Sequence, residues 1–185
     1  MIGAGISSYM DQDKIRMLFN SYFLSQFNYC PLIWMNHNKS LNNKINNLHE
    51  RALRLIYCDH VSDFQELLNR DNSVTIHHRN IQALAILMYK VANDIAPNIV
   101  SELFPVSDVS YNLRSGSQFK QPSVNTVRNG LETVSYLGPK IWNIVPEEIR
   151  TQLSLFAFKN KIKNWVPENC PCRICKIYLR NVGFI

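Results

Sequence analysis

The sequence predicts a mainly α-helical protein, in which a helical bundle is followed by a small β-hairpin and a short helical, basic C-terminal tail. Three observations lead to this fold class. Apolar residues recur at helical spacing through most of residues 1–104. The dipeptide Asn129-Gly130, a strong hairpin signal, separates two β-leaning runs. The chain has 185 residues, 46% of them hydrophobic and 18% charged, which is enough to bury a core and argues against disorder.

In the first 104 residues the apolar spacing predicts helices at 14–27, 40–56, 62–68, 75–96 and 97–104. The expected N-caps are Asp11 or Asp13 for the first helix, Ser40 for the second, Ser62 with Gln65 at capping-box spacing for the third, and Thr75 for the fourth. Pro97 suits the first position of the fifth helix. Residues 83–88 are apolar on nearly every side, so helix 75–96 is expected to be the most buried.

The second predicted helix has an expected inward face and an expected outward face. Lys44, Arg51 and Arg54 lie off the apolar stripe and are expected to face solvent. The side chains expected to face the core are Leu41, Ile45, Leu48, Ala52, Leu55 and Ile56.

The character of the chain changes after Pro105, where Ser, Asn, Gly and Pro become frequent. The β-leaning runs 123–127 and 131–136 on either side of Asn129-Gly130 predict a two-stranded ribbon. Helical spacing returns at 139–145 and at 155–165. We therefore expect three segments: a helical domain at 1–104, a loop and hairpin region with a short helix at 105–150, and a basic helix with a cysteine-containing tail at 151–185.

Most of the positive charge lies in the last fifth of the chain. The formal net charge is +6, and residues 151–185 contain six basic residues against Glu168 alone. A concentrated positive field attracts phosphate backbones or anionic lipid, and the alternative is a solvated tail. If nucleic acid binds here, Trp165 or Tyr178 can stack on a base, and the expected phosphate contacts are Lys159, Lys161, Lys163, Arg173, Lys176 and Arg180.

The cysteines and the ends of the chain favour an intracellular location, in the nucleus or the cytoplasm. Five cysteines is an odd number, and the weakly apolar start of the chain, which has no basic region and is followed by Asp11 and Asp13, does not fit a signal peptide. No stretch approaches the roughly 18 apolar residues that span a bilayer. We expect no membrane association.

The segment 170–175 (CPCRIC) is the strongest candidate for chemistry. The Cys-x-x-Cys spacing of Cys172 and Cys175 is that of two zinc ligands, and Cys170 adds a third sulfur. A structural zinc site needs a fourth ligand, which Cys30, Cys58 or a partner would supply. The alternative is that these are reduced, unligated thiols.

No catalytic residue is expected. Polymerases use closely placed carboxylates to hold two metal ions, and here the closest pair, Asp11 and Asp13, suits helix capping. His77 and His78 are adjacent on a predicted helix and point about 100° apart, so they cannot share one metal without distortion. We interpret them as core or capping histidines.

Several segments in order form a pattern that resembles the region downstream of the catalytic palm in the reverse transcriptase of jockey-like non-LTR retrotransposons (LINEs). They are 25–35 (SQFNYCPLIWM), 48–54 (LHERALR), 73–80 (SVTIHHRN), 111–114 (YNLR), 137–142 (LGPKIW), 158–159 (FK) and 170–176 (CPCRICK). The resemblance covers residues from about 5 to the end. It implies a thumb-like helical domain and a C-terminal extension.

This resemblance implies nucleic-acid contact without chemistry, because the Phe-Ala-Asp-Asp-like catalytic turn, the fingers, the palm and the endonuclease of the family are all absent from the sequence. The leading hypothesis is a non-catalytic C-terminal fragment of an RNA-directed DNA polymerase of a transposable element. Its implied partners are the element's RNA or RNA–DNA hybrid and the remainder of the reverse transcriptase. The alternative is a structural or protein-interaction module with no nucleic-acid ligand of its own.

Overall fold

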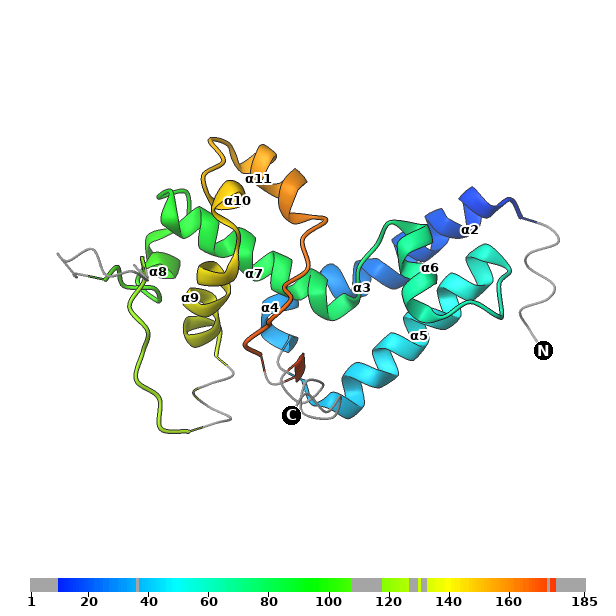
Figure 1. The fold of residues 1–185 in the computed structure, drawn as a ribbon, viewed down its shortest axis with the longest axis horizontal. Coiled ribbons are helices and arrows are strands. Elements are labelled where there is room, and N and C mark those ends of the chain that lie inside the picture. Colours follow the sequence, from blue (N-terminus) through cyan, green and yellow to red (C-terminus); the bar gives the residue numbers. More distant parts are fainter. Residues whose placement is uncertain are drawn as a thin grey trace. The chain divides into compact units, whose positions relative to one another are not determined.

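The computed structural model describes residues 10–35, 37–107, 118–126, 130, 133–172 and 174–175 of the chain. Over this part of the chain the structure is mainly helical, as predicted (Figure 1). It forms two compact units, which we call the N-terminal unit (Met1–Arg79) and the C-terminal unit (Asn80–Ile185). Their boundary lies inside one continuous helix, and it does not coincide with the expected segment boundaries at 104 and 150, which follow changes in composition.

Helices make up most of the described N-terminal unit. Asp11 caps the first of them, because its carboxylate accepts a hydrogen bond from the backbone N–H of Gln12 (2.8 Å). α2, η1 and α3 follow one another directly and correspond to the helix predicted for 14–27. The elements of this unit are α2 (Gln12–Leu18), the π-helical η1 (Phe19–Leu24), α3 (Ser25–Asn28), α4 (Pro31–Trp34), α5 (Lys39–Tyr57), α6 (Phe64–Asp71) and the first residues of α7 (Ile76–Ala92).

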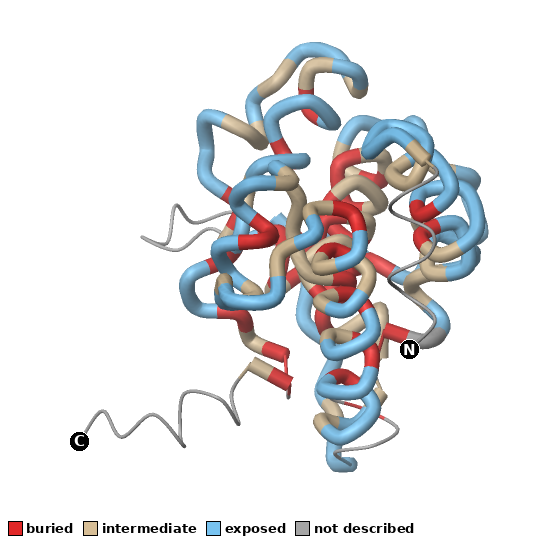
Figure 2. The backbone as a smooth tube through the Cα atoms, turned by 90° about the vertical axis from the view of Figure 1, so that its right-hand side faces the viewer, coloured by how far each residue is buried: buried red, intermediate tan, exposed pale blue. Residues whose placement is uncertain are grey.

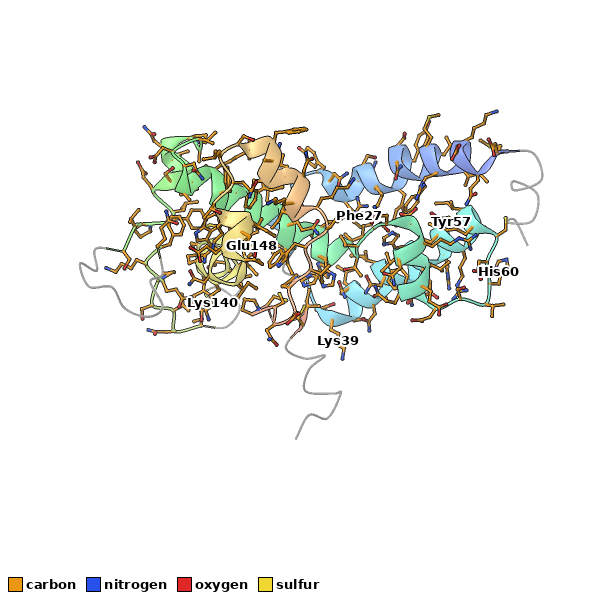
Figure 3. The ribbon with its side chains drawn as sticks, turned by 45° about the horizontal axis from the view of Figure 1, so that its top comes forward. Phe27, Lys39, Tyr57, His60, Lys140 and Glu148 are labelled. Atoms are coloured by element: carbon orange, nitrogen blue, oxygen red, sulfur yellow. The ribbon has the colours of Figure 1, made fainter. Side chains whose placement is uncertain are left out.

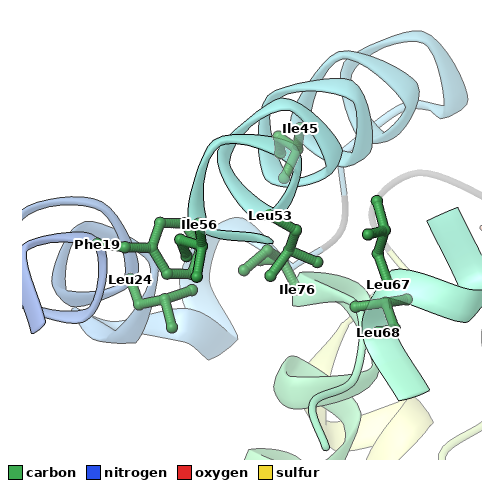
Figure 4. Packing of buried hydrophobic residues seen from close by; sticks show 8 residues of the cluster. All are labelled: Phe19, Leu24, Ile45, Leu53, Ile56, Leu67, Leu68 and Ile76. Atoms are coloured by element: carbon green, nitrogen blue, oxygen red, sulfur yellow. The ribbon is translucent and has the colours of Figure 1, made fainter. Parts of the chain in front are cut away.

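The core of the N-terminal unit brings together side chains from η1, α5, α6 and the start of α7 (Figure 4). Burial of these apolar side chains removes them from water and holds segments that are distant in sequence against one another. The cluster consists of Phe19, Leu24, Ile45, Leu53, Ile56, Leu67, Leu68 and Ile76.

The face of α5 that is buried differs from the apolar face that the sequence predicts for this helix. Leu41, Leu48 and Leu55 were expected inside, but they are 46%, 49% and 46% exposed. Ile45 and Ile56 are buried as predicted, and the other buried positions are Asn42, His49 and Leu53, so that the buried residues follow one side of the helix. The prediction was wrong because it weighed the three leucines above a face that contains an asparagine and a histidine.

Two predicted caps are displaced by one or two residues. Asn38, not Ser40, caps α5, since its side chain accepts a hydrogen bond from the N–H of Leu41 (2.8 Å). α6 begins with a capping box, but Asp63 and Glu66 form it instead of Ser62 and Gln65. Asp63 is the better cap for a physical reason, because its carboxylate also interacts favourably with the positive end of the helix dipole.

His49 is a buried histidine in an aromatic environment. Its ring lies 5.7 Å from that of Phe19, stacked, and 5.6 Å from that of Phe64, edge-on. Among the described residues neither ring nitrogen has a hydrogen-bond partner. Burial, followed by the positive charge of Arg79, lowers the pKa of His49 from 6.5 to about 4. His49 is therefore neutral in the folded protein at neutral pH.

We expect this histidine to make the protein less stable in acid. The unfolded chain, with a histidine pKa near 6.5, binds a proton before the folded chain does. The stabilisation is complete above about pH 6.5 and is lost as the pH falls toward 4. Between pH 7.5 and 4.5 the loss is about 2–3 kcal/mol of unfolding free energy, measurable by urea titration.

His49→Leu should remove this part of the pH dependence. The matched control is His60→Gln, because His60 is exposed (labelled in Figure 3) and its replacement should leave the dependence intact. Comparing variants cancels other acid-sensitive groups, which all of them share. An equal slope of stability against pH in the wild type and His49→Leu would contradict the assignment.

The C-terminal unit is built around the remainder of α7. α7 is the most heavily buried helix, as predicted, with Ile81, Leu84, Ala85 and Met88 all fully buried. Thr75 accepts a hydrogen bond from the N–H of His78 (3.2 Å), in agreement with the predicted cap. The other elements of this unit are α8 (Asn98–Ser101), α9 (Val134–Ile144), α10 (Glu147–Arg150) and α11 (Leu155–Ile162).

Aromatic side chains hold α7, α9 and α11 together. The rings of Tyr89 and Phe158 stack with centroids 4.3 Å apart, and Trp142 lies 6.2 Å from Phe158. The hydroxyl of Tyr89 donates a hydrogen bond to the backbone carbonyl of Gln152 (2.6 Å). Figure 2 shows that buried and exposed positions alternate along the helices of the described chain. The aromatic contacts fix α11, and therefore the segment that follows it, against α7.

The predicted β-hairpin is not found in those of its residues that the structure describes. Residues 134–136, expected in its second strand, form the first turn of α9, and residues 123–126 form no strand. Asn129 lies outside the described residues. The strand-like pairing found in the described chain is a single antiparallel bridge between Val106 and Phe119. The β-leaning residues before Leu137 were misread because helix α9 continues through Pro139, which the prediction placed at a helix start.

In the part of the chain that the structure describes, no helix has the length and apolar character needed to cross a bilayer.

Candidate metal centre

The segment after α11 is held against α7 by a buried glutamine. The side-chain amide of Gln82 donates hydrogen bonds to the backbone carbonyls of Lys163 (3.0 Å) and Trp165 (2.8 Å). Pro167 beyond them is buried. These contacts place the chain that leads to Cys170 along α7.

Four potential metal ligands converge at the end of this segment. They are the imidazole of His77 and the sulfurs of Cys170, Cys172 and Cys175, and their ligand atoms all lie within 4.8 Å of one another. His77 is in the first turn of α7. His77, Cys170 and Cys172 are buried and Cys175 is partly buried.

The donor set and its spacing fit a tetrahedral zinc ion. With Zn–S bonds of about 2.3 Å, tetrahedral ligands lie about 3.8 Å from one another. Ligand atoms within 4.8 Å therefore need only a small contraction to reach that geometry. The backbone N–H of Cys175 points to the sulfur of Cys172 (3.3 Å), which favours a negatively charged sulfur at Cys172. This buried group can hold a metal ion.

Electrostatics at the centre disfavour free thiolates. The side chain of Cys172, together with burial, raises the pKa of the Cys170 thiol to about 12. The side chains of Cys170 and Cys172, again with burial, raise the pKa of Cys175. Three sulfurs this close cannot all carry charge unless a cation offsets it, which is what a bound divalent metal does.

The structure brings together the three predicted cysteines and places beside them a fourth potential ligand, His77, that the sequence did not indicate. Cys30 and Cys58, which were considered for that position, are exposed and lie outside the group. His77 had been interpreted as a core or capping histidine. Its distance from the cysteines in the sequence leaves no spacing signal, and only the fold reveals the proximity.

The predicted phosphate-contacting residues are partly described. Lys159, Lys161 and Lys163 are exposed, while the neighbouring Phe158 and Ile162 are buried. Trp165 is partly buried, and its carbonyl accepts the bond from Gln82. The other predicted contacts, Arg173, Lys176 and Arg180, and the candidate stacking residue Tyr178, lie outside the described residues.

No family model, curated protein or solved structure matches this chain.

Proposed function

We propose that the chain is a non-catalytic, nucleic-acid-binding C-terminal module of a reverse transcriptase from a jockey-like non-LTR retrotransposon, and that a structural zinc ion stabilises it. Two observations support the proposal. One is the ordered set of sequence segments that resembles the post-palm region of that family. The other is the set of exposed lysines on and after α11, close in the chain to the four-ligand centre.

Zinc in this proposal is held by His77, Cys170, Cys172 and Cys175. Four protein ligands fill the tetrahedral positions and leave none for a reacting water, so the ion supplies structure, not catalysis. His77 belongs to α7 and the cysteines to the C-terminal segment. A bound ion therefore links the cysteine-containing segment to α7. This link restrains the chain on the C-terminal side of the lysines.

The exposed lysines give the proposed module its contact with phosphate. Lys159 and Lys163 are four residues apart and share one side of the helical turn, whereas Lys161 points to another side. The buried Phe158 and Ile162 hold this helix in place. Lys159 and Lys163 form the pair suited to neighbouring phosphates of an RNA strand or an RNA–DNA hybrid.

Replacing these two lysines should lower both the affinity for nucleic acid and its dependence on salt. Each phosphate contact contributes about 0.7 to the slope of log K against log salt on single strands and about 0.9 on duplex DNA. In filter-binding titrations over a range of salt concentrations, Lys159→Gln/Lys163→Gln should reduce the slope by about the value of two contacts.

The matched control is Lys14→Gln, since Lys14 is an exposed lysine on α2 of the N-terminal unit. It should leave the slope unchanged. Binding by the wild type that does not vary with salt, or no binding at all, would refute the proposed function.

A second candidate, a structural or protein-interaction module without a nucleic-acid ligand, is favoured by exposed apolar side chains. Leu41, Leu48 and Leu55 recur every seven residues along the outer side of α5 and are each nearly half exposed. On this view they pack against the remainder of the polymerase. Size-exclusion chromatography separates the two candidates, because a soluble monomer that binds nucleic acid counts against the second.

A further inference from the structure

A cavity in the C-terminal unit lies apart from the cysteine centre. Its volume is about 450 Å³, within the range of small-molecule pockets. It is open to solvent, and it is lined by residues at the end of α7, by Gln118, by α9 and by α10. The indole of Trp142 is only 3% exposed, so it forms a fixed wall of this cavity and not a mobile surface group.

Two opposite charges line the cavity without neutralising each other. Glu147 and Arg150 both belong to α10 and both line it. The ion pairs found among the described residues include neither of them. The Nε of Arg150 is buried and has no hydrogen-bond partner in the described chain. The Arg150 side chain as a whole is only partly buried, so its terminal guanidinium nitrogens, and not the buried Nε, are the donors that a ligand in the cavity can reach.

The other polar groups of the cavity are held in defined orientations. The side-chain carbonyl of Gln118 accepts a hydrogen bond from the indole N–H of Trp142 (3.0 Å), which turns its amide N–H₂ away from that bond. The amide of Asn93 donates to the carbonyl of Tyr89 (2.9 Å), which leaves the oxygen of Asn93 as an acceptor. The cavity therefore offers a carboxylate, a guanidinium and two fixed amides.

We propose that this cavity binds a guanine base. Guanine carries two neighbouring donors, N1–H and the N2 amino group, which match the two oxygens of the Glu147 carboxylate. It also carries two neighbouring acceptors, O6 and N7, which match a guanidinium such as that of Arg150. One guanine base can therefore hydrogen-bond to the Glu147 carboxylate and to the Arg150 guanidinium at the same time. The base is uncharged, so neither the negative nor the positive side chain repels it.

Other ligands of similar size fit these groups less well. A phosphate is repelled by the carboxylate of Glu147. Adenine has no pair of adjacent donors for a carboxylate, and uracil has a single N–H flanked by acceptors. Cytosine offers one amino group to Glu147, so it engages one carboxylate oxygen where guanine engages both. Guanine should therefore bind most tightly.

Two sources of guanine share this chemistry, a free nucleotide and an unpaired base of a nucleic-acid strand. The second source rests on the proposed function, and the first does not. The probes are therefore GMP, AMP, CMP and UMP, which differ only in the base, and oligothymidine strands that carry one central guanine or one central adenine. Binding of each to the full chain is measured by titration calorimetry.

GMP is expected to bind one site per chain, about tenfold more tightly than AMP. Glu147→Gln should weaken GMP binding about tenfold, because a neutral amide cannot accept from both donors. The control is Glu148→Gln, the adjacent glutamate of α10 (labelled in Figure 3), which does not line the cavity and should leave GMP binding unchanged. Arg150→Gln should also weaken GMP binding. If the loss of Arg150 disturbs the fold, Glu147→Gln still tests the site by itself.

The possible results test the guanine site separately from the proposed nucleic-acid binding. Equal affinity for all four mononucleotides, or GMP binding that survives Glu147→Gln, overturns the guanine site even if oligonucleotides still bind in a salt-dependent way. A preference for the guanine-bearing oligonucleotide that Glu147→Gln removes supports a strand as the source. A GMP preference without that oligonucleotide preference supports a free nucleotide as the source.

Discussion

Chelation of zinc is expected to lower the melting temperature of the purified chain by about 10 °C. The ion binds ligands that only the folded chain brings together, so it stabilises the folded state by mass action. Free zinc at a thousandfold excess over its dissociation constant contributes about 4 kcal/mol. For a chain of this size, each kcal/mol corresponds to roughly 2–4 °C. Calorimetry with and without a chelator measures the difference directly.

Cysteine variants test whether the loss of melting temperature on chelation arises at the proposed metal centre. Cys172→Ser should have a melting temperature close to that of the chelated wild type and should no longer respond to chelator. Cys58→Ser is the matched control, because Cys58 is exposed and lies outside the ligand group. Hydrogen exchange should show faster exchange at residues 165–175 after chelation, since the ion fastens this segment to α7. If the chelator left the melting temperature unchanged, the result would contradict the proposal that a zinc ion stabilises the folded chain.

The second large effect is expected from Phe158→Ala. Phe158 is fully buried, stacks on Tyr89 of α7 and contacts Trp142 of α9. Truncation of a buried phenylalanine leaves a cavity and costs about 3–5 kcal/mol. Because Phe158 anchors α11, the variant should also bind nucleic acid less tightly, through poorer placement of Lys159 and Lys163. Urea unfolding gives the stability, and the filter-binding assay gives the affinity.

Phe156→Ala is the matched control for this variant. Phe156 lies on the same helix but is 75% exposed, and its replacement should change the unfolding free energy by less than about 0.5 kcal/mol. Similar losses for Phe156→Ala and Phe158→Ala would show that α11 is not anchored through Phe158.

Local sequence patterns predicted the helices well where burial agrees with propensity. α7 is apolar on nearly every side between residues 83 and 88, and it is the most buried helix. Cys170, Cys172 and Cys175 were identified from spacing alone, because ligands within one short segment leave a local signal. The fold class was therefore accessible from the sequence.

Features that depend on tertiary contact were not accessible in the same way. α5 buries Asn42 and His49 while Leu41 and Leu48 remain exposed, a choice made by the neighbouring helices and not by hydrophobicity. His77 joins the cysteines only through the path of the C-terminal segment along α7. The cavity at α10 likewise depends on residues far apart in the chain, and no spacing in the sequence indicates it.

Cobalt substitution tests the central claim, one ion held by three sulfurs and one imidazole, most directly. Cobalt(II) added to the metal-free wild type is expected to bind one equivalent and give the intense visible absorption of a tetrahedral thiolate site, displaced by zinc. His77→Ala should bind more weakly and shift the spectrum, whereas His78→Ala should match the wild type. No tetrahedral spectrum in the wild type, or an unchanged spectrum in His77→Ala, would contradict the four-ligand centre.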